Sequence, residues 1–217
     1  MGGKGLLEGK IIIVTGSGSG IGRAACLLFV QEGAKVAALD NNADALEETV
    51  RMAHSQGNIL GQTADVGSKP DVDRAIAICV ERFGPLSGAF NNAGIDGRTA
   101  SPDRLGNYPM ALWQRLIEVN QTGVLYCMQA EISAMLRAGG GAIVNTASVA
   151  GVRGMPSSGA YAATKHAVIG LSKTAAIEYA RDGLRVNVVA PGAVDTPMNA
   201  SIDMRSEEHT SELQSPA

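Results

Sequence analysis

The chain has 217 residues, of which 45% are hydrophobic, so it is long enough to bury the core of one domain. Its formal charge of −3 provides no basic field that would attract nucleic acid or an anionic membrane surface. No apolar run is long enough to span a membrane, and the first residues lack the apolar core of a signal peptide. We therefore expect a cytoplasmic protein with neither a nucleic acid nor a membrane as partner.

The cysteine and histidine residues show no pattern typical of a metal site or a disulfide framework. Cys26, Cys79 and Cys127 each lie in an apolar, helix-like run, which is typical of small buried side chains in a reducing compartment. The three histidines are scattered, without a carboxylate cluster at ligand spacing. We expect no metal site.

Short apolar runs alternate with helix-like segments along the chain. The apolar runs predict strands at 10–15, 35–39, 59–64, 86–90, 142–147 and 184–189. Apolar residues at helical spacing predict helices at 23–31, 43–55, 70–83, 109–137 and 158–181. Strands that alternate with helices form a parallel sheet. The predicted fold class is therefore α/β, a Rossmann-like, doubly wound parallel sheet of six strands with helices on both faces.

A glycine-rich loop, TGSGSGIG at 15–22, separates the first strand from the first helix. Backbone N–H groups of such a loop, together with the positive helix N-terminus, can approach a pyrophosphate closely. The spacing differs from the commonest dinucleotide fingerprint, and glycines in a tight turn can be purely structural. Their place directly after the first strand favours nucleotide binding. The candidate contacts are Gly16, Ser17, Ser19, Gly20, Ile21 and Gly22.

Asp40 ends the second predicted strand, 18 residues after Gly22. A carboxylate at this position can accept both hydroxyl groups of an adenosine ribose, and it repels a 2′-phosphate. Neither Ser17 nor Asn41 provides the positive charge that a 2′-phosphate needs. Asp40 could also be an ordinary turn residue. We expect NAD as the cofactor, with NADP the less favoured alternative.

Three residues around a strand-to-helix turn form a candidate acid–base group. Ser148 follows the strand at 142–147, and Tyr161 and Lys165 share one face of the next helix, four residues apart. A phenol with a pKa near 10 needs a shift of roughly 3 units to act as a base at neutral pH. A lysine cation about 5 Å away supplies roughly 3 kcal/mol at an effective dielectric constant of about 20. Alone, such a pair could equally lie on an ordinary solvated helix face.

Taken in order, the motifs resemble those of the short-chain dehydrogenase/reductase family. The shared set is TGSGSGIG at 15–22, Asp65-Val66, NNAG at 91–94, Asn120, Ser148, Tyr161 with Lys165, and Pro191-Gly192 with Thr196. The resemblance implies that Asp65 and Val66 border the adenine and that Asn92 lies along the cofactor. It also implies that Val194 and Thr196 contact the nicotinamide carboxamide, beside cofactor contacts from Pro191 and Gly192.

The resemblance also implies catalytic roles. Ser148 would hydrogen-bond the substrate oxygen while Tyr161 exchanges its proton. Lys165 would hold the nicotinamide ribose and depress the Tyr161 pKa, and Asn120 would fix a water molecule that links Lys165 to solvent. The implied activity is hydride transfer between NAD(H) and a small secondary alcohol or ketone.

Alternatives to this activity stay open at the level of the sequence. Within the family, an NADP-type 3-oxoacyl-thioester reductase or a sugar dehydrogenase fits the same motifs. A nucleotide-binding module without turnover is the alternative from another class. In a complete parent protein we expect a homodimer or homotetramer, because the helices at 109–137 and 158–181 carry more apolar residues than one sheet face needs.

The sequence departs from the family pattern after Met198. The family continues through a substrate-binding lid, a further helix and a seventh strand at the sheet edge, for which the last 19 residues leave no room. The eleven residues RSEEHTSELQS, at 205–215, correspond to one reading frame of a common short-read sequencing adapter. We expect an incomplete NAD-binding domain at 1–204, a non-native tail at 205–217, and impaired turnover without the lid.

Overall fold

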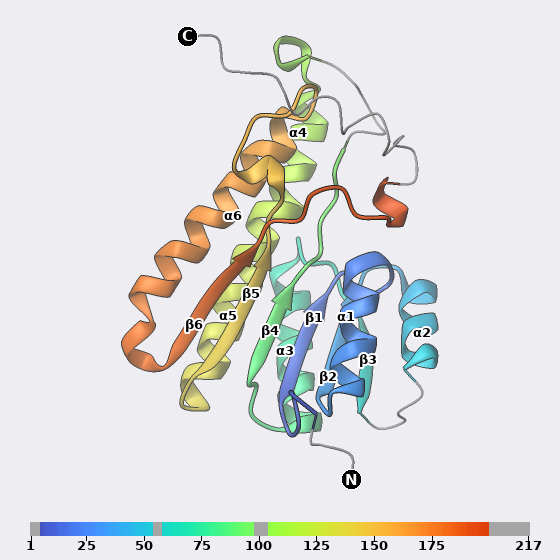
Figure 1. Ribbon diagram of the computed structural model, residues 1–217, viewed down its shortest axis with the longest axis vertical. Coiled ribbons are helices and arrows are strands. Elements are labelled where there is room, and N and C mark those ends of the chain that lie inside the picture. Colours follow the sequence, from blue (N-terminus) through green and yellow to red (C-terminus); the bar gives the residue numbers. More distant parts are fainter. Residues whose placement is uncertain (1–4, 54–57, 98–103, 200–217) are drawn as a thin grey trace.

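The computed structural model describes residues 5–53, 58–97 and 104–199, which form a sheet flanked by helices (Figure 1). Its strands are β1 (Ile11–Thr15), β2 (Lys35–Asp40), β3 (Ile59–Thr63), β4 (Gly88–Asn91), β5 (Gly141–Thr146) and β6 (Leu184–Val189). Its α-helices are α1 (Gly20–Gln31), α2 (Ala43–Met52), α3 (Lys69–Phe83), α4 (Met110–Ile117), α5 (Gly123–Arg137) and α6 (Gly159–Glu178). All strand pairs are parallel, in the order β3-β2-β1-β4-β5-β6. The predicted doubly wound fold is confirmed.

The sheet separates two hydrophobic cores. Ile12 and Val14 of β1 pack with side chains of α1 and α2 on one face. Ile11 and Ile13 enter the other core, which α3, α5 and α6 cover. Successive side chains of a strand point to opposite faces, so β1 contributes to both cores. Every residue of β1 is buried, as its continuous apolar run predicts.

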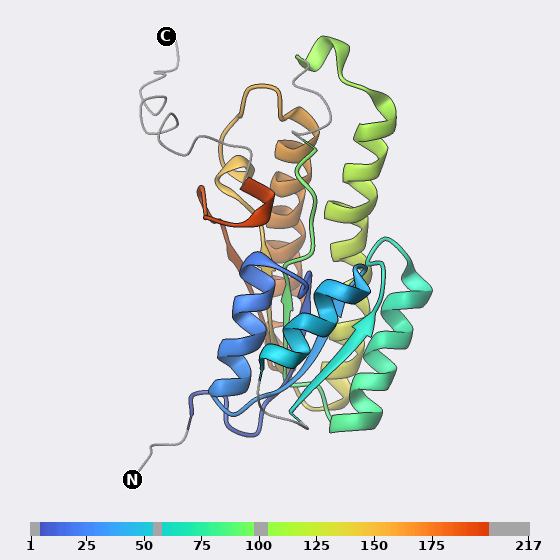
Figure 2. The same ribbon diagram turned by 90° about the vertical axis from the view of Figure 1, so that its right-hand side faces the viewer.

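The carboxyl ends of the parallel strands meet at one edge of the sheet. The strand order reverses between β1 and β4, because β2 and β3 lie on one side of β1 and β4 to β6 lie on the other. Ligands of open α/β sheets bind in the crevice at such a switch point. In Figures 1 and 2 the segment after β6, drawn in red, lies above the N-terminal end of α1. The loop before α1 and the segment after β6 therefore meet at this edge, where Gly20 lies beside Thr196.

The helix predicted at 109–137 is confirmed, but it contains one irregular turn. It starts as α4, passes through the π-helical turn η2 (Glu118–Thr122), and continues as α5. A π turn inserts an extra residue into the helical repeat, and such turns are frequent at functional sites. Asn120 lies in this turn and is fully buried. Periodicity located the helix but not the irregular turn.

The remaining predictions about the fold concern the cysteines, a membrane span, the tail and the oligomeric state. The three cysteines are buried, as predicted. Within the described part of the chain, no helix combines the length and apolar character that a membrane crossing requires. The predicted tail at 205–217 lies outside the described residues. Exposed apolar side chains on α5 and α6, Leu136 and Ile177, are compatible with the predicted homo-oligomer, which stays a prediction.

Candidate functional site

A cavity of about 330 Å³ lies along the carboxyl edge of the sheet, within the size range of small-molecule sites. Its walls come from the glycine loop, from the ends of β2, β4 and β5, and from the segment after β6. The predicted site residues that line it are Gly16, Ser19, Gly20, Ile21, Asp40, Asp65, Val66, Asn92, Ser148, Tyr161, Lys165, Pro191, Gly192, Val194 and Thr196. Residues far apart in the sequence are thus brought to one cavity.

Two residues of the glycine loop, Ser17 and Gly22, do not line the cavity and instead support the loop from behind. The side chain of Ser17 is fully buried, and its hydroxyl donates a hydrogen bond to Val14 O at 2.8 Å. A Cβ atom at Gly22 would lie only 2.0 Å from the carbonyl oxygen of Gly16. Gly22 is therefore required for close packing of α1 against the loop.

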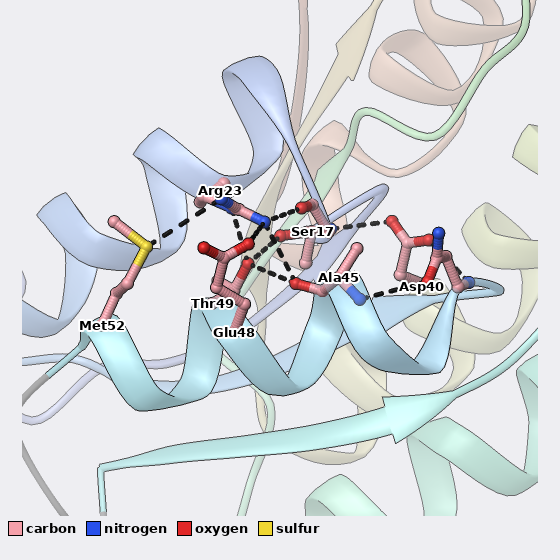
Figure 3. A network of polar contacts seen from close by, with 9 residues as sticks. Ser17, Arg23, Asp40, Ala45, Glu48, Thr49 and Met52 are labelled. Carbon is pink, nitrogen blue, oxygen red and sulfur yellow. Dashed lines mark hydrogen bonds and ion pairs between the residues drawn. The ribbon is translucent and has the colours of Figure 1, made fainter. Parts of the chain in front are cut away.

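An arginine that the sequence analysis did not single out ties the loop to helix α2. Figure 3 shows Arg23 reaching from α1 toward Glu48 and Thr49. Its guanidinium donates to Gly18 O and to Ala45 O, and it forms an ion pair with Glu48 at 2.8 Å. Its Nε atom donates to Thr49 Oγ1 at 3.0 Å. The network orders the loop, but an arginine near a helix start gives no sequence signal of such a role.

Asp40 stands beside the same loop and keeps hydrogen-bonding capacity. One carboxylate oxygen accepts a bond from the backbone N–H of Gly18 at 2.7 Å, and the other accepts from Asn42 N–H at 2.9 Å. Each carboxylate oxygen can accept more than one donor. The carboxylate therefore both shapes the loop and can receive ribose hydroxyl groups on the cavity side.

Lys165 is the most constrained polar group of the site. Its side chain is only 3% exposed, and its Nζ atom donates to the carbonyl oxygen of Thr146 at 2.8 Å. The same atom lies 5.5 Å from the centre of the Tyr161 ring. Burial lowers the pKa of Lys165 to about 8, so the amine is still mostly protonated at neutral pH. The structure thus places a cation next to the phenol.

Ser148 is held at the end of β5 by a local turn. Its backbone is extended, and its hydroxyl oxygen accepts a hydrogen bond from Ala150 N–H at 3.1 Å, which caps a short 3₁₀ turn. The side chain is largely buried but lines the cavity together with Tyr161. A hydroxyl group and a phenol therefore border the same space.

Asn120 lies behind the cavity wall rather than in it. Its amide group donates to Ile95 O at 2.7 Å and accepts from Ile95 N–H at 2.8 Å. A Cβ atom at Gly94 would be 3.2 Å from Asn120 Oδ1 and 3.4 Å from Lys165 Nζ, so the three residues are neighbours. Asn120 therefore joins the π turn to the segment after β4, and its predicted water contact stays a prediction.

A second residue missed in the sequence, Arg115, lies at the far end of the cavity. Its guanidinium is 3.4 Å from Asp65 and 3.0 Å from Glu118. Asp65 also accepts a hydrogen bond from Gly67 N–H at 2.8 Å. These contacts, which are partly exposed and thus individually weak, orient Asp65 where it lines the cavity with Val66.

The fold and the site together define a class of protein. A doubly wound parallel sheet with a glycine loop, an acidic end of β2 and a Tyr/Lys pair around one cavity is typical of nicotinamide-dependent oxidoreductases. The family model described as short chain dehydrogenase matches residues 10–207. The chain belongs to the short-chain dehydrogenase/reductase family and is an oxidoreductase of that family.

Named relatives support this assignment. The chain is 42% identical over 195 residues to cyclohexanol dehydrogenase of Acinetobacter sp. (strain SE19), covering 89% of the chain and 76% of that protein. It is 46% identical over 193 residues to 2,5-dichloro-2,5-cyclohexadiene-1,4-diol dehydrogenase of Sphingobium indicum (strain B90A), covering 88% and 75%. The crystal structure of NAD⁺-bound xylitol dehydrogenase matches with a TM-score of 0.81 and 36% identity, covering 86% and 71%.

We predict that Gly22→Ala distorts the glycine loop. The new methyl group cannot fit at 2.0 Å from Gly16 O, so the backbone must move, at a cost of about 1–3 kcal/mol for such overpacking. Nucleotide affinity, measured by NADH fluorescence, should fall together with the urea midpoint. Gly170→Ala is the matched control, because that position on α6 has open space and should be neutral or slightly stabilising. Equal effects at the two positions would contradict the packing role of Gly22.

Proposed function

We propose that the chain transfers a hydride between NAD(H) and a secondary alcohol or ketone, with Tyr161 as the general acid/base. The observation that carries the proposal is the shared cavity. Ser148, Tyr161 and Lys165 line one part of it, and the glycine loop and Asp40 line another. A proton-transfer group next to a nucleotide-binding loop is the arrangement that hydride transfer requires.

The residues of the cavity fit a dinucleotide. Gly16 adopts a φ of 68°, and a Cβ atom there would lie 2.8 Å from Ala93, so this turn needs glycine. The helix α1 begins at Gly20 and directs its free N–H groups toward the loop side of the cavity. When bound, the nicotinamide ring accepts or donates the hydride. The chain's own residues bind and orient the reactants and move the proton.

The surroundings of Asp40 favour NAD over NADP. Its carboxylate would repel a 2′-phosphate, while its free acceptor capacity suits the two ribose hydroxyls. The nearby cation, Arg23, is engaged by Gly18 O, Thr49 and Glu48. The likeness to an NAD⁺-bound xylitol dehydrogenase agrees with this preference.

Proton transfer is assigned to three side chains. The Ser148 hydroxyl donates a hydrogen bond to the substrate oxygen, and the Tyr161 hydroxyl gives that oxygen its proton or removes it. The Lys165 ammonium group lies 5.5 Å from the centre of the Tyr161 ring. A cation about 5 Å from a phenolate charge stabilises it by roughly 3 kcal/mol at an effective dielectric constant of about 20. One N–H of Lys165 is used by Thr146 O, which leaves two for the nicotinamide ribose and solvent.

The substrate we propose is a compact, uncharged ring alcohol or the corresponding ketone. Two relatives with 42% and 46% identity are named for dehydrogenation of six-membered ring alcohols. The apolar side chains of Ile95, Val149 and Met155 line the cavity together with Ser148. A polyol remains the second candidate because of the xylitol dehydrogenase likeness, and a 3-oxoacyl thioester is the third because of 37% identity to a 3-oxoacyl-[acyl-carrier-protein] reductase.

Cofactor choice is testable at the end of β2. In Asp40→Ala combined with Asn41→Arg, we expect weaker NADH binding and stronger NADPH binding, since the change removes a repulsive charge and adds a phosphate partner. Fluorescence titration with both nucleotides measures the shift. Glu47→Gln, at an exposed position of α2, should leave the ratio unchanged. Equal or tighter binding of NADPH by the wild type would overturn the assignment.

The function itself is tested with Tyr161→Phe. Loss of the proton carrier should lower kcat on the order of 10²–10⁴-fold and leave NADH affinity nearly unchanged. Tyr126→Phe on α5, which lies outside the cavity lining, is the control and should keep both values. The assay uses cyclohexanol, xylitol and a 3-hydroxyacyl thioester, of which cyclohexanol should give the highest kcat/KM.

Three results would count against parts of this proposal. Near-normal turnover in Tyr161→Phe would remove Tyr161 from the mechanism. A higher kcat/KM for xylitol or the thioester would replace the ring-alcohol substrate. NADH binding by the wild type without turnover of any compound would favour a nucleotide-binding module.

A further inference from the structure

A buried polar cluster lies between the sheet and helices α5 and α6, outside the cavity. It consists of Asn91 on β4, Asn145 on β5, Glu131 on α5 and Ser172 on α6. The Asn91 amide donates to Glu131 Oε2 at 2.8 Å and to Asn145 Oδ1 at 2.9 Å. The Asn145 amide donates to Ser172 Oγ at 2.8 Å. Each side chain belongs to a residue that is at most 2% exposed, so one hydrogen-bonded unit joins four elements inside the core.

Glu131 sits in this cluster without a counter-ion. No ion pair of the described residues includes it. Burial raises its pKa to about 8, while the hydrogen bond from Asn91 lowers the pKa by a smaller amount. The titratable neighbour on its own helix is Cys127, whose pKa is raised by burial and by Glu131. β4, β5 and α6 contribute only uncharged side chains to the cluster, those of Asn91, Asn145 and Ser172. The carboxyl group is therefore protonated at neutral pH.

A protonated carboxyl group also fits the balance of hydrogen-bond donors and acceptors in the cluster. The Asn91 Oδ1 atom is buried and has no hydrogen-bond partner. A carboxylic acid brings one O–H donor into the cluster, whereas a carboxylate brings only acceptors. Ionisation would thus add an unpaired buried charge and remove the one donor that Glu131 supplies.

The cluster is connected to the proposed acid–base group by two short paths. Asn145 directly precedes Thr146, whose carbonyl oxygen accepts the hydrogen bond from Lys165 Nζ. Ser172 donates to Val168 O at 2.6 Å, and Lys165, Val168 and Ser172 follow one buried stripe of α6. Any loosening of the cluster therefore acts on both the strand and the helix that hold Lys165.

We propose that Glu131 is a positioning residue that, as a neutral acid, docks α5 on β4 and, through Asn91 and Asn145, supports α6 on β5, and that its ionisation at alkaline pH loosens this docking. The inference rests on the proposed function only for the roles of Tyr161 and Lys165. The docking itself is a property of the fold. Its consequence is a stability that falls between pH 4.5 and about 8, with a loosened site above that range.

The direction of the pH effect follows from the two states of the chain. The folded-state pKa of Glu131, about 8, is above the ordinary value of 4.5, so the folded chain binds this proton more tightly than the unfolded chain. The contribution of protonated Glu131 to the free energy of unfolding is complete below pH 4.5. It is lost progressively as the pH rises to about 8. Over that interval this group lowers the folding equilibrium constant by up to about tenfold per pH unit.

The test compares wild type, Glu131→Gln and Glu81→Gln by urea unfolding between pH 6 and pH 8. Glutamine keeps an acceptor for Asn91 and a donor but cannot ionise. We expect the folding constant of Glu131→Gln relative to that of the wild type to rise by about 50-fold over these two pH units. Glu81 is exposed on α3, so Glu81→Gln should keep a constant ratio to wild type.

A second readout reports on positioning rather than on global stability. Amide hydrogen exchange of α6, corrected for the intrinsic pH dependence, should accelerate in wild type as the pH rises from 6.5 to 8.5 but not in Glu131→Gln. Exchange in α1 should change little in either protein. With a turned-over substrate, kcat of the wild type should fall relative to that of Glu131→Gln over the same interval.

A pH-independent stability ratio, or equal exchange of α6 in the two proteins at both pH values, would overturn the proposal. If Glu131→Gln does not fold, infrared titration of the wild type replaces it. A protonated carboxyl band that persists at pH 7 and disappears near pH 8 supports the proposal, and its absence at pH 7 refutes it. Stability, exchange and infrared results do not depend on turnover, so they are independent of whether the proposed function holds.

Discussion

The buried contact between the Lys165 ammonium group and the carbonyl oxygen of Thr146 is the constraint on which the site depends. Burial lowers the pKa of Lys165 from 10.5 to about 8, a change of about 2.5 units. At 1.36 kcal/mol per unit, holding the cation in the folded chain costs on the order of 3 kcal/mol at neutral pH. A side chain kept for stability alone would not need this charge. Stability given up at a charged, functional position is a common trade-off in enzymes.

The parallel sheet makes this placement possible because β5 and α6 deliver Thr146, Ser148, Tyr161 and Lys165 to one edge. A separate set of contacts, centred on Arg23, holds the glycine loop against α2 at the same edge. One half is held by the buried stripe of α6 and the other by a hydrogen-bond network around the loop, and the two are joined by the hydrogen bond from Asn92 N–H to Thr15 Oγ1 at 3.0 Å.

Most of the fold was predictable because each strand is a short apolar run and each helix shows apolar residues at helical spacing. Asp40 and Ser148 were predictable because the strand ends of a doubly wound sheet converge. Other cavity residues, such as Asp65, Asn92 and Thr196, were predicted from the family resemblance. What the sequence did not reveal depends on side-chain packing across elements. Ser17 and Gly22 look like nucleotide contacts but pack behind the loop, and Asn120 lies in a π turn that a helical period cannot show. Arg23 and Glu131 belong to ionisable residue types that usually face solvent, so a single sequence gives no signal of the Arg23 network or of the burial of Glu131.

Lys165→Met tests whether Lys165 is a cation that the fold holds at a cost in stability. We predict a higher urea midpoint than wild type at pH 7, together with loss of both NADH affinity and turnover. The stability gap should be full below about pH 8 and shrink as the pH rises toward 10.5, because the folded chain releases this proton before the unfolded chain does. A Lys165→Met protein that is less stable than wild type at pH 7, or that binds NADH and turns over substrate normally, would contradict the claim.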